Sequence, residues 1–347
     1  MNVSRATVSR CFTNHPGISP ETRARVFDLA SRMGYSHLEN AKPRAHSPKF
    51  RQLSIGTLVC VDLPSFENTR YDNPGQKILT GVTEYFRTVD TTIDLHYVRS
   101  ADRDVTSESY RRIAGSRRRR WKGVLLIYPF ARPVVDELLA TYPVISLVEQ
   151  YGSSSLNCVD VDHYRGISRV VDALIAAGHR RIGFFTWKYG VEAGWALRRY
   201  SAYLEKLTAV GFPLRLEDAI IAKGPEKKFI EQARETVLQR TRDGVTAWIC
   251  AADHQAYDLI AWLESKGVKV PADLSITGFD GISPPSGAPL LSTVEIPFRQ
   301  IGITGAKRLS DMVHKRFDAP QHILLDCNLR AGETIAAPSK KKPAAHR

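Results

Sequence analysis

From Leu53 onward, the sequence alternates short apolar runs of strand length with longer amphipathic stretches that have helical periodicity. The strands predicted from these runs are 54–61, 92–97, 123–128, 144–147, 182–185, 248–251 and 275–277. The helices predicted between them include 76–86, 167–177, 198–210, 229–240 and 256–266. Regular alternation of strand and helix is typical of doubly wound parallel sheets, so we predict an α/β fold.

The alternating region is too long for one sheet. It runs from Leu53 to near Pro338, and a single hydrophobic core stops growing at about this size, so that longer chains divide into domains. We therefore predict two lobes, each built on its own parallel sheet. In open α/β sheets, ligands bind in the crevice beyond the carboxyl ends of the strands. Binding residues are expected at those ends.

Composition argues against several classes of protein. The longest apolar runs, such as 123–128, are far shorter than the ~20 residues of a membrane-spanning helix, and no signal peptide is recognised. The five cysteines are scattered without a C-x-x-C pair, so neither a disulfide framework nor a zinc site is predicted. We expect a cytoplasmic protein with no membrane partner, no metal and no other cofactor.

The basic charge of the chain is concentrated at its two ends. The formal net charge is +13, and residues 1–52 hold nine basic and three acidic side chains, a net charge of +6. The segment 339–347 adds four basic residues without an acid, and we interpret it as a solubilising tail. A basic amino-terminal segment is typical of proteins that bind a polyanion such as DNA.

Two short amphipathic helices are predicted within the basic amino-terminal segment. Ser4 is a favourable N-cap for the first helix, whose apolar side chains recur at intervals of three and four. Arg5 and Arg10 fall on the face away from that apolar stripe. The second helix begins at Ser19, a hydroxyl cap that precedes a proline, and ends before Gly34.

This segment resembles the DNA-binding head of the lac-repressor (LacI/GalR) family of bacterial transcription regulators. The resemblance rests on V-S-x-x-T-V-S-R, an asparagine-containing loop, S-x-x-T-R-x-x-V and G-Y. It implies that the first predicted helix is the recognition helix of a helix-turn-helix. Arginine can bind guanine through two hydrogen bonds and hydroxyls hold phosphates, so the residue types suit that role. The matching positions are Arg5, Ala6 and Arg10 for base reading, and Ser4, Thr7 and Ser9 for phosphate contact or capping.

The first helix of the family's head has no counterpart here, because Met1 falls within the turn that follows it. We therefore interpret residues 1–35 as a truncated helix-turn-helix head, expected to be poorly stable and to bind DNA weakly. A misassigned start, a truncated form and a degenerate gene are the alternatives. Residues 36–52 correspond to the hinge and linker, but His37 and Arg44 replace the usual proline and leucine of the hinge helix.

Nearly the whole remaining chain resembles the core of the same family. The resemblance implies a two-lobed, periplasmic-binding-protein-like core over 53–338 that binds an effector and forms dimers. The expected lobes are 53–178 with 297–318, and 179–296 with 319–338, with crossings near Gly178, Pro297 and Asp318. The matching stretches are IGTLV at 55–59, LIAAGHRRIG at 174–183, GVKVPADLSITGFD at 267–280 and LLSTV at 290–294.

In relatives that sense sugars or nucleobases, the effector lies between the two lobes. Arg199 and Asp280 match an arginine and an aspartate that bind it, and a guanidinium with a carboxylate can bracket neighbouring hydroxyl groups. Phe66 matches an aromatic residue of the loop after the first core strand. Trp187 follows a predicted strand and is a second stacking residue.

Ala252 occupies a position where many sugar binders carry an asparagine, so one polar contact to a ligand is lost. The neighbouring Asp253 is interpreted as the N-cap of the helix predicted over 256–266, since aspartate is among the residues favoured there. The identity of the ligand is left open by this departure from the family pattern.

Two functions remain open from the sequence. The first is a DNA-binding transcriptional repressor that binds double-stranded operator DNA as a homodimer and responds to a small ligand, expected to be a carbohydrate. The second is a ligand-binding receptor that has lost specific DNA binding, which the incomplete head favours. An enzyme is not predicted, since G-x-S-x-G, P-loop, G-x-G-x-x-G and H-E-x-x-H patterns are absent.

Overall fold

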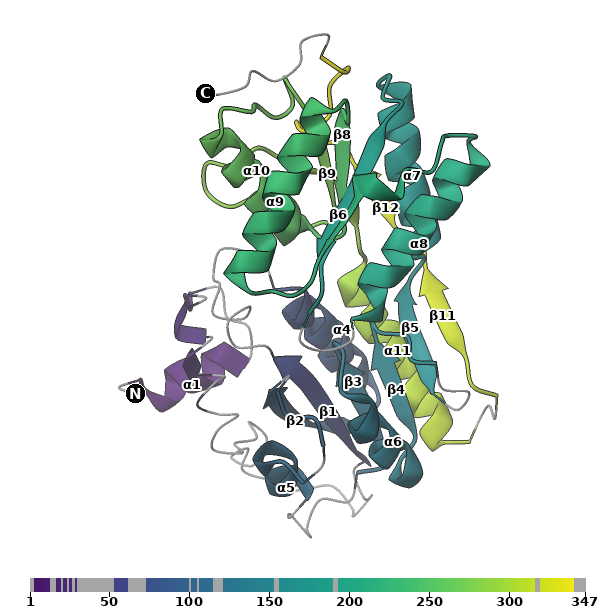
Figure 1. Cartoon of the computed structure of the whole chain (residues 1–347). Helices are drawn as coiled ribbons and strands as arrows, with labels where there is room; N and C mark the ends of the chain where they lie inside the picture. The colour runs from purple at the N-terminus through teal and green to yellow at the C-terminus, as the bar shows by residue number, and fades with distance from the viewer. Residues whose placement is uncertain are drawn as a thin grey trace. The chain divides into compact units, whose positions relative to one another are not determined.

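The computed structural model describes residues 3–12, 17–19, 21–23, 25–26, 29, 53–61, 73–99, 101–104, 106–114, 121–152, 156–189, 193–315 and 319–339. The predicted hinge over 36–52 lies outside these residues. The chain divides into two compact units, Met1–Asp160 with Phe298–Leu324, and Val161–Pro297 with Leu325–Arg347. Figure 1 labels the elements, beginning with α1 (Arg5–Phe12).

Unit 1 contains a six-stranded sheet with the strand order β11-β5-β4-β3-β1-β2. Strands β1 to β5 pair in parallel, so their carboxyl ends share one edge. All residues of β3, β4 and β5 are buried, as expected for parallel strands covered on both faces. The strands are β1 Leu53–Val61, β2 Thr91–Arg99, β3 Gly123–Ile127, β4 Val144–Leu147, β5 Asn157–Val161 and β11 His322–Leu325.

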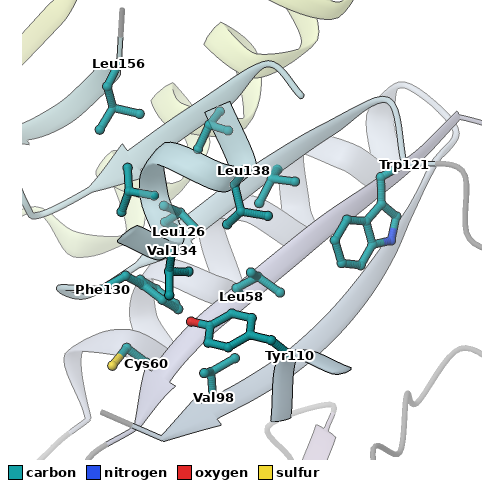
Figure 2. Close-up of a cluster of buried hydrophobic side chains, with 13 residues drawn as sticks. Leu58, Cys60, Val98, Tyr110, Trp121, Leu126, Phe130, Val134, Leu138 and Leu156 are labelled. Carbon is teal, nitrogen blue, oxygen red and sulfur yellow. The ribbon is translucent and has the colours of Figure 1, made fainter. Parts of the chain in front are cut away.

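Helices cover both faces of this sheet. On one face, Leu126 of β3 belongs to a buried cluster with Tyr110 of α5 and Val134 of α6, which Figure 2 shows at close range. On the other face, a Cβ added to Gly123 would meet Leu309 of α11, so the two elements lie in contact there. The helices are α4 Pro74–Thr88, α5 Glu108–Ala114, α6 Arg132–Thr141 and α11 Phe298–Val313.

Two glycines allow α4 and α11 to pack backbone against backbone. A Cβ on Gly81 would lie 2.0 Å from the carbonyl oxygen of Arg299, and a Cβ on Gly302 would lie 2.1 Å from that of Ile78. Both distances are far below van der Waals contact, and the atoms concerned are main-chain atoms that cannot rotate away. This crossing therefore requires a residue without a side chain on each helix.

Unit 2 contains a second six-stranded sheet, with the order β12-β10-β9-β8-β6-β7. Strands β6 to β10 pair in parallel, and β12 closes one edge antiparallel to β10. The carboxyl ends of β6, β8 and β9 therefore lie side by side. The strands are β6 Ile182–Trp187, β7 Ala219–Ala222, β8 Ala247–Cys250, β9 Ser275–Asp280, β10 Ser292–Glu295 and β12 Asn328–Arg330.

The helices of unit 2 also lie on both faces of its sheet. Phe184 of β6 packs against Tyr200 and Tyr203 of α8, with ring centroids 5.5 and 5.4 Å apart. The indole N–H of Trp248 in β8 donates to the hydroxyl of Thr241 in α9 at 2.9 Å. The helices are α7 His163–Ala176, α8 Gly194–Ala209, α9 Lys227–Arg242 and α10 Asp253–Ser265.

The G-H-R-R-I stretch after α7 ends that helix and anchors unit 2. Gly178 has a φ of 102°, which a residue without Cβ adopts readily. Nδ1 of the next residue, His179, lies 2.9 Å from the hydroxyl of Thr246. Nε2 of the same ring lies 2.9 Å from the hydroxyl of Ser275 and 2.9 Å from the carbonyl oxygen of Ala336. Burial lowers the pKa of His179, so the ring is held as a neutral group.

A late segment of the chain completes unit 2. The carbonyl oxygen of Thr334 accepts a hydrogen bond from the backbone N–H of Ile276 at 3.0 Å. The side-chain hydroxyl of Thr334 accepts one from the backbone N–H of Ser292, also at 3.0 Å. Together with β12 and the contact of Ala336 with His179, these bonds tie residues 328–336 across the edge and base of the sheet. The second sheet is therefore assembled from segments that are distant in sequence.

The α/β fold and the strands predicted from the sequence are confirmed, the latter as β1, β2, β3, β4, β6, β8 and β9. The first division between units falls at Asp160–Val161 rather than near Gly178, because α7 packs on α8, β10 and β12. The others fall at Pro297–Phe298 and at Leu324–Leu325, the latter beyond the position expected near Asp318. Among the described helices, none has the length and apolarity needed to cross a membrane.

Candidate functional site

Helix α1 carries the residues predicted to bind DNA. The Oγ of Ser4 accepts a hydrogen bond from the backbone N–H of Thr7 at 3.1 Å, so the predicted N-cap is confirmed. Cys11, on the predicted apolar stripe, is fully buried. The side chain of Ser9 lies outside the described residues. The exposed side chains of α1 include Arg5, Ala6 and Arg10.

The second helix of the amino-terminal segment begins with the same kind of cap. The Oγ of Ser19 accepts from the backbone N–H of Thr22 at 3.2 Å, and residues 21–23 and 25–26 are helical. Val26 is 4% exposed and supplies the apolar face expected for this helix. Among the described residues, the two helices thus bury Cys11 and Val26, while Arg5, Arg10 and Arg25 remain exposed.

At the carboxyl edge of the second sheet, Arg199 of α8 faces Asp280, the last residue of β9. Nη1 of the arginine lies 3.1 Å from Oδ1 of the aspartate. Nη1 also donates to the carbonyl oxygen of Ala251, directly after β8, and Nε donates to Nδ1 of His163 at 3.3 Å. The structure therefore brings together the two residues predicted to bracket a ligand, and it fixes the guanidinium through acceptors at two strand ends.

The guanidinium of Arg199 also lies between two aromatic rings. Its central carbon is 3.9 Å from the ring centroid of Phe279 and 4.5 Å from that of Trp195. Trp195 is one helical turn before Arg199 in α8, a spacing that places two side chains on one helix face. Cation–π contacts of this kind contribute about 0.5–2 kcal/mol each and hold the planar group in one orientation.

Asp253 is a buried carboxylate that the sequence interpretation misplaced. The interpretation of Asp253 as an N-cap is wrong, because α10 begins at Asp253 and Ala252 is the N-cap residue. The carboxylate instead accepts from the backbone N–H of Ile282 at 2.9 Å and from the hydroxyl of Thr293. It therefore links the start of α10 to the loop after β9 and to β10.

Asp253 and Asp280 are two acids at this edge with different cations nearby, since Asp280 pairs with Arg199 whereas the positive charge of Arg330 acts on Asp253. Burial, followed by the negative charge of Asp280, raises the pKa of Asp253 to about 7. Burial also raises the pKa of Asp280, although Arg199 opposes this shift. Asp280 has a φ of 145°, a backbone conformation that non-glycine residues rarely adopt and that is concentrated at functional sites.

An Asp253→Asn variant tests the raised pKa. Between the ordinary pKa of 3.8 and about 7, folded wild-type protein binds a proton that the unfolded chain has released. The wild-type free energy of unfolding should therefore fall as the pH rises through that window. Asparagine does not ionise, and it keeps an acceptor for the backbone N–H of Ile282. We therefore expect the difference in melting temperature, variant minus wild type, to increase from pH 5 to pH 8.

Thermal unfolding followed by circular dichroism at several pH values measures this difference. Asp136→Asn, at an exposed position of α6, is the control and should follow the wild-type profile. Equal pH dependence of wild type and Asp253→Asn would contradict the assignment.

The other three residues predicted to bind the ligand, Trp187, Ala252 and Phe66, are not among the contacts of the Arg199–Asp280 pair described above. Trp187 ends β6 and is 6% exposed, with its ring packed 5.5 Å from His254 and 6.3 Å from Tyr189. Ala252 is buried and contributes no polar side-chain group to the edge. Phe66 lies outside the described residues. The described residues contain no cluster of histidine, cysteine or carboxylate side chains that could hold a metal ion.

A polar network at the same edge was not anticipated. The hydroxyl of Tyr189 lies 3.0 Å from Nε2 of His254 and accepts from Nε2 of Gln255 at 2.8 Å. Burial and the positive charge of Arg199 lower the pKa of His254 to about 4, so this ring is neutral at neutral pH. Tyr189 follows β6, whereas His254 and Gln255 follow β8, and their position after neighbouring parallel strands is the signal that would have identified them.

Two sequence profiles match the chain. The profile described as bacterial regulatory proteins of the lacI family matches residues 1–37, and the one described as a periplasmic binding protein-like domain matches residues 171–335. The chain belongs to the LacI family. This LacI-family protein is thus a DNA-binding transcriptional regulator, and the family consists of regulators rather than enzymes.

Similar proteins extend over both parts of the LacI-family chain. The HTH-type transcriptional regulator IpsA of Corynebacterium glutamicum is 26% identical over 97% of this chain and 95% of its own length. A structure of the regulator CelR with cellobiose has a TM-score of 0.68 and 22% identity, covering 96% of each chain. The lac repressor dimer bound to operator and the anti-inducer ONPF has a TM-score of 0.65 and 20% identity, covering 83% of this chain and 95% of the other. These structures share the fold.

Proposed function

We propose that this LacI-family regulator is a repressor whose affinity for operator DNA is controlled by a small ligand at the carboxyl edge of the second sheet. The observation that carries the proposal is the Arg199–Asp280 pair, held between aromatic rings in a chain that also presents a capped, basic helix. The regulator acts as a homodimer in the cytoplasm, where its DNA target lies. The dimeric lac repressor on its operator supports this arrangement by similarity.

On DNA, Arg5, Ala6 and Arg10 contact base edges in the major groove, while Ser4, Thr7 and Ser9 contact phosphates or cap the helix. Two protomers would present two such helices to half-sites about 34–36 Å apart, one helical turn of DNA. Exposure of the arginines and capping by Ser4 support these roles.

For the ligand, Arg199 and Asp280 form hydrogen bonds to neighbouring hydroxyl groups, and Phe66 and Trp187 line the same site. Ala252 leaves space where a polar contact is common in the family. The class of ligand is a carbohydrate, which the complex of CelR with cellobiose supports by similarity. Ligand binding shifts the equilibrium between conformations that bind DNA and those that do not.

Arg5→Ala should weaken operator binding by about tenfold to a hundredfold, because a bidentate arginine–guanine contact is worth about 1–3 kcal/mol. Arg10→Ala should have an effect of the same order. Fluorescence anisotropy with an operator selected from random DNA, repeated over a salt series, measures both. The matched control is Arg215→Ala, an exposed arginine outside the amino-terminal segment, which should leave operator affinity unchanged.

The same titrations test the proposed function as a whole. Wild-type protein should prefer the selected operator over unrelated DNA, and its affinity should fall with increasing salt because phosphate contacts release counterions. A protein that binds a saccharide but binds all DNA equally would be a receptor without specific DNA recognition. That outcome would overturn the repressor function.

A further inference from the structure

Tyr189 lies at the carboxyl edge of the second sheet, two residues after the end of β6. Its ring centroid lies 5.3 Å from that of Trp195 and 6.3 Å from that of Trp187. Trp195 in turn packs on the guanidinium of Arg199, whose central carbon lies 4.5 Å from the centroid of the Trp195 ring. Tyr189 thus lies next to the charged pair that is proposed to bracket the ligand.

Exposure distinguishes Tyr189 from the aromatic residue that the sequence favoured. Trp187 is buried beneath its neighbours, whereas Tyr189 and Trp195 are half-buried and retain surface in solvent. A stacking partner must present a ring face to the ligand. Tyr189 meets that requirement better than Trp187.

The ring of Tyr189 is held by two hydrogen bonds to its hydroxyl. Gln255 is fully buried and donates through Nε2 at 2.8 Å, while Nε2 of His254 lies 3.0 Å away. The neutral imidazole of His254 can either accept the hydroxyl proton or donate to the hydroxyl oxygen through Nε2, so the hydroxyl is held by both residues. An aromatic side chain fixed in this way loses little conformational freedom when a ligand stacks on it.

The hydrogen-bonding capacity of the edge favours a ligand rich in donors. Oε1 of Gln255 is buried and has no hydrogen-bond partner among the described residues, and a buried acceptor of this kind is costly to leave unmatched. Asp280 is already paired with Arg199, and the carboxylate of Asp253 already accepts from Ile282 and Thr293. A carboxylate or phosphate on the ligand would compete with Asp280 for Arg199, whereas a neutral hydroxyl group can donate a hydrogen bond to Asp280.

We propose that Tyr189 is the specificity-determining residue of the effector site, and that it stacks on the apolar face of a neutral saccharide ring. His254 and Gln255 act as positioning residues that hold the tyrosine. This inference rests on the proposed function, because it assumes that the edge around Arg199 and Asp280 receives the effector. Beyond the proposed function, it specifies that the ligand is uncharged and that Tyr189 is the residue that favours ligands with a sugar ring.

The test compares Tyr189→Leu, Tyr189→Phe and wild-type protein by thermal shift and by tryptophan fluorescence, using full-length chains. The neutral probes are cellobiose, sucrose, glucose and myo-inositol, and the anionic probes are glucuronate and glucose 6-phosphate. At least one neutral probe should stabilise wild-type protein. Tyr189→Leu should bind that probe about tenfold more weakly, and Tyr189→Phe should show a smaller loss because the ring is kept.

Tyr200→Leu is the matched control, since Tyr200 is a half-buried tyrosine of the same unit that packs on Phe184 away from the charged pair. It should bind the neutral probe as wild-type protein does. Sorbitol, which is acyclic and has no ring face, separates stacking from a structural effect. Loss of the tyrosine should weaken binding of the ring compound more than binding of sorbitol.

Three results would overturn the inference: unchanged saccharide affinity in Tyr189→Leu, an equal loss in Tyr200→Leu, or stabilisation of wild-type protein by no neutral probe. Failure of the proposed function is distinguished by DNA binding. If wild-type protein binds its operator selectively while only the anionic probes bind, the regulator stands and the assignment of Tyr189 and of a neutral ligand fails.

Discussion

Replacing Arg199 by alanine is expected to lower the free energy of unfolding by about 3–5 kcal/mol and to abolish ligand binding. The side chain is 5% exposed and pairs with Asp280, whose side chain is 16% exposed, so its removal leaves a largely buried carboxylate without its cation. The rings of Phe279 and Trp195 lose the guanidinium that lies between them. Urea denaturation measures the stability, and the thermal shift produced by the saccharide that stabilises wild-type protein measures binding.

Two further variants separate the two effects of Arg199. Arg199→Ala/Asp280→Asn removes the unpaired charge, so it should recover part of the stability without recovering binding. Arg199→Lys keeps the charge but not the planar donors, and it should bind weakly. Arg180→Ala, at an exposed position of the same unit, is the control. A normal ligand-induced shift in Arg199→Ala would refute the assignment of this residue to the site.

Gly302→Ala is expected to destabilise unit 1 by about 3 kcal/mol or more, because the added methyl group overlaps the carbonyl oxygen of Ile78 and forces α4 and α11 apart. The sign is diagnostic, since glycine to alanine in an ordinary helix interior stabilises it by about 1 kcal/mol. Gly81→Ala should behave in the same way, through the carbonyl oxygen of Arg299.

Urea denaturation followed by far-ultraviolet circular dichroism measures the loss in each glycine variant. Gly152→Ala is the control, because a Cβ there would meet no atom within 4 Å. Its stability should remain within about 0.5 kcal/mol of wild type. A Gly302→Ala protein as stable as wild type would mean that the helices do not cross as closely as described.

The fold was largely predictable from the sequence, but β5 was not recognised as a strand. β5 (Asn157–Val161) contains an asparagine and an aspartate and therefore lacks the apolar run that marked its neighbours. Its buried Asn157 accepts from Nε of Arg308 and from the backbone N–H of Gln321, both at 3.0 Å. Partners that distant in sequence offset the desolvation of the amide, and local periodicity carries no trace of them.

The candidate site was accessible only where single residues match a family motif. Arg199 and Asp280 were identified in this way, and the structure places them 3.1 Å apart. Trp195 was overlooked although it precedes Arg199 by one helical turn, because an aromatic residue on a helix is usually part of a core. Asp253 was misassigned because the choice between a helix cap and a tertiary acceptor depends on where Ile282 lies.

The bonds from residues 328–336 to the second sheet have a consequence for how the protein is made. Domains fold as units while the ribosome synthesises the chain. The first five strands of unit 1 emerge early, but β9 and β10 of unit 2 await Thr334, and the ring of His179 awaits Ala336. Unit 2 therefore completes its sheet only after residues 328–336 have joined it, so its folding depends on contacts between segments that are far apart in the sequence.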